Sequence, residues 1–169
     1  MGQDGIGAER PLRGAFAARW RDATRWRDND AYGHMNNVVY YEYFDSAVNR
    51  WLIDSGALAA PGDAPGDAPG DAGGGGVIGV VAETACRFFA AVGFPETVET
   101  GLAVARIGRS SVTYRLALWG AAPEAAAVCR YVHVYVDRAT RRPAPLPAAL
   151  RAALERLQAA SCQAGRAPL

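Results

Sequence analysis

The sequence predicts an α+β fold, in which a curled antiparallel sheet of five strands wraps around one long central helix and a short helix ends the chain. Two patterns predict this fold. An apolar segment with helical spacing follows residue 37, and four long β-like runs follow the glycines that end at residue 76. The predicted helix carries two apolar stripes, which are both covered only if the sheet bends around it, as long twisted strands do.

The first predicted strand lies within residues 15–26, where apolar residues and arginines are mixed as in an edge strand, and a turn follows at residues 28–33. The predicted helix then has its main apolar stripe at Tyr40, Phe44, Ala47 and Trp51. Either Asn36 or Asn37 can cap its start, because a short amide side chain accepts from the free N–H groups of the first turn. Gly56 is a reasonable stop signal.

Four further strands are predicted at residues 77–89, 98–107, 111–119 and 126–137, separated by glycines and prolines, and we expect them to form a meander. In the last strand, valines share one face while Tyr131, His133 and Tyr135 share the other. We therefore interpret His133 as an interface or surface histidine. After three prolines, leucines at helical spacing predict the C-terminal helix, with Leu150, Leu154 and Leu157 on its apolar side.

A single domain fits the length of 169 residues, since folding at that size buries about 70% of the chain's surface. We expect residues 1–13 to be a flexible N-terminus and residues 14–169 to form the domain. Within the domain, residues 59–76 contain an Ala-Pro-Gly-Asp repeat and a run of glycines. This composition cannot bury apolar area to offset its ordering entropy, so it predicts a mobile surface loop.

Composition excludes several classes of function. Lys plus Arg is 18 and Asp plus Glu is 17, a net charge of +1, so no overall field favours nucleic acid. The chain has no apolar run near ~18 residues, so we expect no membrane span. The N-terminus lacks the basic start and apolar stretch of a secretory signal. The three isolated cysteines, Cys86, Cys129 and Cys162, indicate reduced thiols in a cytoplasmic protein.

The segment with the clearest chemistry is residues 28–37, DNDAYGHMNN. Its D-x-D-x-x-G pattern at Asp28, Asp30 and Gly33, followed by a helix that carries Tyr40, resembles the 4-hydroxybenzoyl-CoA thioesterase family of hotdog-fold enzymes. The segments VAET at residues 81–84, GRSSV at 108–112 and VYVD at 134–137 also look like landmarks of single-domain members, among them the Tol-Pal-associated enzymes.

The resemblance implies a hotdog fold and an acyl-CoA thioesterase. It makes Asp30 the catalytic carboxylate and gives the backbone N–H of Asn37 the role of hydrogen-bonding the thioester carbonyl. It also implies a homodimer or homotetramer with sites at subunit interfaces. No metal or redox cofactor is required, and coenzyme A enters only as part of the acyl-CoA substrate.

The chemistry also follows from the residue types. Thioester hydrolysis places negative charge on the carbonyl oxygen, and a helix N-terminus offers aimed N–H donors and a positive dipole end. A carboxylate in the preceding turn can activate water as a general base, or attack the carbonyl directly and form an anhydride. Both routes are open at this point.

The remaining candidates have supporting roles. Many Tol-Pal-associated relatives carry a His at the position of Asn37, whereas here the histidine is His34. His34 can polarise the substrate, orient Asp30, or be an ordinary loop histidine. Gly33 is expected to serve a backbone torsion or a close approach. The further expected substrate-binding residues are Asn36, Tyr40, Arg87, Arg109 and Ser110, the arginines as partners of the CoA phosphates.

Three other interpretations concern the same segment. A hotdog protein can bind an acyl-CoA or acyl carrier without hydrolysing it. A hotdog dehydratase would use a His with an acid partner, for which only His34 is at hand. A calcium loop is rejected, because Tyr32 replaces an oxygen ligand and Val39 stands where the closing Glu should be.

Overall fold

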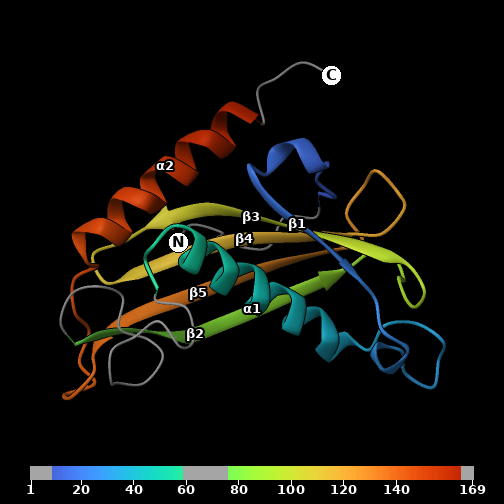
Figure 1. Ribbon diagram of the computed structural model, residues 1–169, viewed down its shortest axis with the longest axis horizontal. Coiled ribbons are helices and arrows are strands. Elements are labelled where there is room, and N and C mark those ends of the chain that lie inside the picture. Colours follow the sequence, from blue (N-terminus) through green and yellow to red (C-terminus); the bar gives the residue numbers. More distant parts are fainter. Residues whose placement is uncertain (1–8, 59–75, 165–169) are drawn as a thin grey trace.

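The computed structural model describes residues 9–58 and 76–164 of the chain. It contains a five-stranded antiparallel sheet with the order β1-β3-β4-β5-β2. The strands are β1 (Ala18–Ala23), β2 (Val77–Phe88), β3 (Thr97–Ile107), β4 (Ser111–Trp119) and β5 (Ala127–Asp137). The two helices are α1 (Asn37–Asp54) and α2 (Ala148–Ala164). Figure 1 shows α1 lying across one face of the curled sheet, so the predicted hotdog fold is confirmed.

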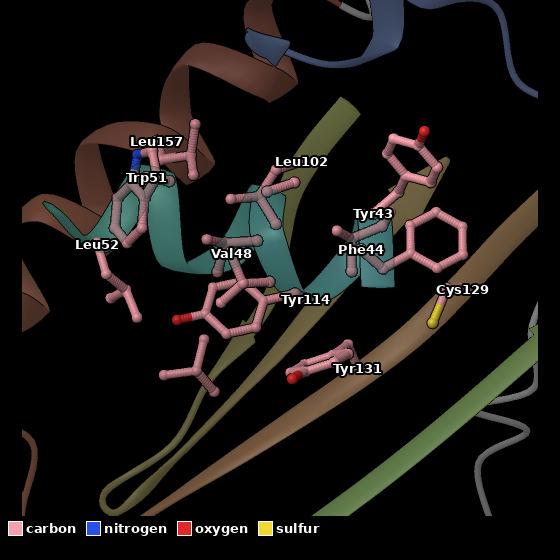
Figure 2. Packing of buried hydrophobic residues seen from close by; sticks show 14 of the residues in the cluster. Tyr43, Phe44, Val48, Trp51, Leu52, Leu102, Tyr114, Cys129, Tyr131 and Leu157 are labelled. Carbon is pink, nitrogen blue, oxygen red and sulfur yellow. The ribbon is translucent and has the colours of Figure 1, made fainter. Parts of the chain in front are cut away.

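The long helix fits the face of the sheet because its apolar residues recur at helical spacing. They are Tyr40, Tyr43, Phe44, Ala47, Val48, Trp51 and Leu52, and all are buried. Figure 2 shows several of them over Tyr114 of β4 and over Cys129 and Tyr131 of β5. The predicted helix start and the stop at Gly56 are both confirmed, and Gly56 has φ +72°.

The expected meander is wrong in one respect. Strands β3, β4 and β5 follow one another across the sheet, but β2 pairs with β5 instead of with β3. The chain leaves β1 at one edge, crosses the sheet as α1, and enters β2 at the opposite edge. It then returns to pair β3 with β1. The two edge strands are therefore β1 and β2, and the helix connects them.

The first strand is shorter than predicted because a short 3₁₀ helix stands at each end. Residues Arg13–Ala15 form one and Trp26–Asp28 the other. Since β1 is short, it covers only part of the free edge of β3, and α2 runs along the rest (Figure 1). The side chain of Gln158 in α2 donates to the Ala105 carbonyl, 3.3 Å away.

The opposite face of the sheet has a small core of its own. Phe16 packs edge-to-face on Trp119, with ring centroids 5.2 Å apart. The indole N–H of Trp119 donates to the Pro11 carbonyl at 3.0 Å, and Arg13 donates to the Gly120 carbonyl. Pro11 and Arg13 belong to the segment 1–13 expected to be flexible. Residues 1–8 of that segment and residues 59–75 of the expected mobile loop lie outside the described residues.

None of the helices in the described ranges is long and apolar enough to span a membrane.

The thiols of Cys86, Cys129 and Cys162 are free. Although Cys86 and Cys129 are far apart in sequence, they stand opposite each other on β2 and β5. Burial raises the pKa of each of these two thiols to about 12, so both are poor nucleophiles at neutral pH.

Candidate active site

The turn between β1 and α1 is a small closed loop. Asn29 and Met35 pair as an isolated β-bridge, and the Asp30 N–H donates to the His34 carbonyl at 3.0 Å. The Gly33 N–H donates back to the Asp30 carbonyl at 3.2 Å. Gly33 has φ +86°, which confirms the predicted need for a glycine torsion at this position. The loop thus holds Asp30 and His34 side by side just before the helix.

The carboxylate of Asp30 is held by one of its oxygens. Oδ1 accepts the Tyr32 N–H at 2.8 Å, and Oδ2 lies 3.8 Å from Nδ1 of His34. The Asp30 side chain is 18% exposed and that of His34 is 48% exposed. Oδ2 accepts no hydrogen bond within the described residues. An oxygen of this kind next to an imidazole can accept a proton from water or attack a carbonyl carbon.

The neighbouring carboxylate, Asp28, has a different role. It is only 1% exposed and accepts the Arg25 N–H at 2.7 Å, the Arg25 side chain at 2.8 Å and the Tyr43 hydroxyl at 3.0 Å. Burial acts to raise the pKa of Asp28, but these hydrogen bonds and the Arg25 charge outweigh it, so the pKa is lowered. Asp28 therefore stays ionised and fixes the turn to α1.

The start of α1 lies directly behind the turn. Asn36 is the N-cap, and its side chain accepts the Val38 N–H at 3.0 Å. Asn37 is the first helical residue, and its N–H has no acceptor within the described residues. Of the two capping residues left open by the sequence, the structure thus selects Asn36. The N–H of Asn37 remains available to a ligand at the positive end of the helix dipole.

Tyr40 and Arg87 belong to this end of the molecule but face different ways. Tyr40 is 3% exposed and its ring meets Phe88 of β2 edge-to-face, with centroids 5.0 Å apart. Arg87 is exposed and precedes Phe88 in the same strand, so it points to the opposite face of the sheet. Tyr40 thus borders the helix start from inside, whereas Arg87 faces away from it.

Arg109 and Ser110 are not brought to this site within one chain. They form the turn between β3 and β4, where their carbonyls accept from Leu146 and Tyr135. The turn between β1 and α1 lies near the other end of β3. With 11 residues in β3 and a rise of ~3.3 Å per residue, the separation is roughly 30 Å.

His133 is not at the surface of the chain, contrary to one of the two expectations for it. It is 5% exposed and lies under α1 between Tyr131 and Tyr135, on the core face of β5. Its Nδ1 has no partner among the described residues, and burial lowers its pKa to about 4. The imidazole is therefore neutral at physiological pH.

The structure also shows site residues that sequence reasoning missed. Tyr43 and Arg25 hold Asp28, and burial together with the bond to Asp28 raises the Tyr43 pKa to about 12. Arg25 also pairs with Glu42, at 3.2 Å. Tyr43 looked like an ordinary core residue of the helix. The sequence offers one signal for this role, which is that Tyr43 carries a hydroxyl among the apolar residues of the helix.

A hollow of about 200 Å³ lies on the β1 side of α1, lined by Arg25, Glu42, Asp22 and Arg50 among others. Its charges already pair with one another, because Arg50 binds Asp22 through two hydrogen bonds of 2.9 and 2.8 Å. Asp30 does not line this hollow. No group of three or more potential metal ligands occurs in the described part of the chain.

Comparison with known proteins places this arrangement in context. The protein PA5185 of Pseudomonas aeruginosa strain PAO1 is 48% identical, with 88% of this chain and 96% of that chain covered and a TM-score of 0.76. A thioesterase from Thermus thermophilus, solved with coenzyme A and Zn, is 26% identical, with 86% and 97% covered and a TM-score of 0.66.

A 1,4-dihydroxy-2-naphthoyl-CoA thioesterase from Synechocystis is 15% identical, with 82% and 96% covered and a TM-score of 0.65, a similarity of fold alone. The search of curated proteins gave no match. The family model described as the thioesterase-like superfamily matches residues 24–154, a span that includes both the acidic turn and the whole sheet from β2 to β5. The chain belongs to the thioesterase-like superfamily.

Proposed function

We propose that this protein hydrolyses an acyl-CoA thioester to the free acid and CoA. The observation that carries the proposal is the position of Asp30, in the turn directly before a helix whose first N–H, that of Asn37, has no acceptor in the described chain. The D-x-D-x-x-G pattern supports an enzyme of the 4-hydroxybenzoyl-CoA thioesterase type. The Thermus relative, solved with coenzyme A, supports a CoA ester as substrate.

In the proposed reaction the thioester oxygen accepts the Asn37 N–H, and the positive end of α1 stabilises the charge that develops there. Asp30 removes a proton from water while the water oxygen bonds to the carbonyl carbon. The C–S bond then breaks, and the leaving CoA thiolate takes up a proton. Alternatively, Asp30 attacks the carbon itself and forms an anhydride, which water cleaves. Both routes use CoA only as the leaving group.

The test is the release of thiol from a panel of aliphatic and aromatic acyl-CoA substrates. Replacing Asp30 by Asn keeps the size of the side chain but removes the base, so we expect kcat to fall about 10²- to 10⁴-fold. Asp54→Asn is the matched control, because Asp54 is an exposed carboxylate at the far end of α1. Turnover by Asp30→Asn near that of the control would overturn the proposal.

A second candidate is a hotdog protein that binds an acyl-CoA or acyl carrier without hydrolysis. The observation that favours it is Asn37 at the helix start, where the resemblance to the Tol-Pal-associated enzymes implies a histidine in many of them. The same panel separates the two functions. Tight binding of an acyl-CoA without thiol release by the wild-type protein would favour the binding role.

We also propose that the active form is a homodimer or a dimer of dimers. Strand β2 has 12 residues at the edge of the sheet, where Val81 is 49% and Phe88 44% exposed. An edge of this length that no other described strand pairs with invites pairing with a second copy. Two-fold antiparallel pairing would put the Val77 end of one β2 beside the Phe88 end of the other.

The proposed pairing has a consequence for the site. The turn with Arg109 and Ser110 lies at the Val77 end of the sheet, since Ser111 pairs with Val134 and Ile78 with Val136. The second copy would thus bring its own Arg109 and Ser110 toward Asp30.

The free thiols of the chain support a reducing compartment, and we place the reaction in the cytoplasm.

A further inference from the structure

An exposed aromatic pair lies beside the turn that carries Asp30. Trp26 is 79% exposed and Phe94 is 42% exposed. Their rings meet edge-to-face, with centroids 5.9 Å apart and planes at 82°. Large aromatic side chains in contact with each other and with water typically mark a binding surface. The acidic turn and the loop between β2 and β3 therefore present a joint apolar platform to solvent.

The platform is fixed to the candidate site by short contacts. The Phe94 N–H donates to Oδ1 of Asn29 at 3.0 Å, and Asn29 immediately precedes Asp30. Gly93 makes this approach possible, because a Cβ there would lie only 2.9 Å from the same Oδ1. On the other side, Trp26 belongs to the 3₁₀ helix that Asp28 closes. Both rings thus sit on backbone that is tied to the turn of Asp30.

An exposed arginine directly follows Trp26 in the chain. This residue, Arg27, has no ion pair within the described ranges. Arg25, by contrast, is already paired with Asp28 and Glu42. A guanidinium of this kind, next in the chain to an exposed aromatic residue, suits a ligand that carries both a flat ring and phosphate.

We propose that Trp26 and Phe94 bind the purine base of the substrate's CoA, and that Arg27 binds one of its phosphates. The inference rests on the proposed function, which supplies a substrate with this nucleotide. An apolar acyl group would need an enclosed pocket, whereas this platform is open. A contact with a second copy of the chain is the alternative occupant, and the sedimentation of Trp26→Ala distinguishes it from the purine. A purine needs only a flat apolar surface on which to stack.

The test compares three thioesters of one acyl group that differ in how much of CoA they contain: acyl-CoA, acyl-pantetheine and acyl-N-acetylcysteamine. Only the first has the nucleotide. For Trp26→Ala and for Phe94→Ala we expect kcat/KM with acyl-CoA to fall about 10-fold or more, mainly through KM. With the two shorter thioesters it should not change. Leu12→Ala, which removes a 41% exposed side chain at a remote position, is the control.

The comparison of the three thioesters can also overturn the assignment. An equal loss on acyl-CoA and acyl-pantetheine would overturn the assignment, because the rings would then contact the arm or the acyl group. No loss on any substrate would overturn it as well. If Trp26→Ala changes the sedimentation coefficient together with all three activities, the platform is a contact between copies, and the purine proposal is wrong.

Failure of the proposed function can be told apart from failure of this inference. If the wild-type protein releases no thiol, the hydrolase assignment fails, and binding of adenosine 3′,5′-bisphosphate is then measured by calorimetry. Binding by the wild type that is weakened about 10-fold in Trp26→Ala would support the purine subsite. Equal affinities, or no binding by either protein, would overturn it.

Discussion

Asp28 and Asp30 are two residues apart, yet their surroundings give them different chemistry. Asp28 is enclosed and accepts from Arg25 and Tyr43, so each of its oxygens has a partner. Asp30 has one oxygen tied to the Tyr32 N–H and the other toward His34. A carboxylate with saturated hydrogen bonds is a poor base, because its charge is already stabilised. The geometry thus separates a structural acid from a candidate reactive acid.

The pH dependence of stability can be predicted from His133. Burial lowers its pKa in the folded chain to about 4, whereas an unfolded chain has a His pKa of about 6.5. Below pH 6.5 the unfolded chain binds a proton that the folded chain does not. The free energy of unfolding should therefore decrease as the pH falls from 6.5 to 4, by up to about 3 kcal/mol.

His133→Phe should remove this part of the pH dependence, since a ring without a titrating nitrogen takes its place. Urea unfolding at several pH values between 7 and 4 measures the effect. Leu12→Ala, which changes an exposed apolar residue and no titrating group, is the control and should keep the wild-type slope. An unchanged slope in His133→Phe would show that the acid sensitivity originates elsewhere.

At the scale of elements, the start of α1 joins stability to the candidate site. The Asn36 side chain caps the helix, and the backbone N–H of Asn36 donates to the Asp28 carbonyl at 2.9 Å. Asn36→Ala should lower the free energy of unfolding by about 1 kcal/mol, because the Val38 N–H loses its acceptor. Thermal or urea unfolding measures this loss. Asn36→Ser keeps an acceptor and should restore most of it, and equal losses in both variants would argue against capping.

The sequence predicted most element bounds because they depend on local patterns. The strand 111–119 and the helix start at Asn37 agree with the structure, since alternation and helical spacing are properties of short segments. The pairing of β2 with β5 was not predictable in this way, because strand order depends on contacts between distant segments. The shortening of β1 likewise depends on Asp28 bonds that no periodicity encodes.

The faces of β5 show a second limit. Tyr131, His133 and Tyr135 face the core, and Val132 and Val134 are more exposed than they are. Valine normally indicates the buried face of a strand. The pattern of hydrophobicity alone would therefore assign the valine face of β5 to the core and the tyrosine face to solvent, the reverse of what the structure shows. The tyrosine hydroxyls make burial possible, as Tyr131 donates to Asp45 Oδ1 at 2.5 Å. The sequence of β5 alone does not predict that Asp45 on α1 accepts this hydrogen bond.

For the whole molecule, the edge formed by β2 is the surface on which the proposed assembly depends. Within the described residues no strand pairs with the outer side of β2, and Val81 and Phe88 are exposed there, whereas α2 covers part of the opposite edge of the sheet. The separation of Arg109 from Asp30 within one chain gives this edge a functional meaning. If the arginine binds substrate, a single chain lacks a complete site and the proposed dimer supplies the missing part.

Val81→Arg tests this dependence. A charge on the exposed edge strand should oppose pairing, because the guanidinium would have to be buried against a second β2 without a partner. We expect the variant to sediment as a monomer with an unchanged circular dichroism spectrum, and to lose acyl-CoA hydrolysis together with dimerisation. Leu12→Arg places the same charge on another exposed apolar residue and should keep both properties. A monomeric wild type with full activity would contradict the proposed assembly. Loss of the dimer without loss of activity would show instead that Asp30 and the start of α1 suffice within one chain.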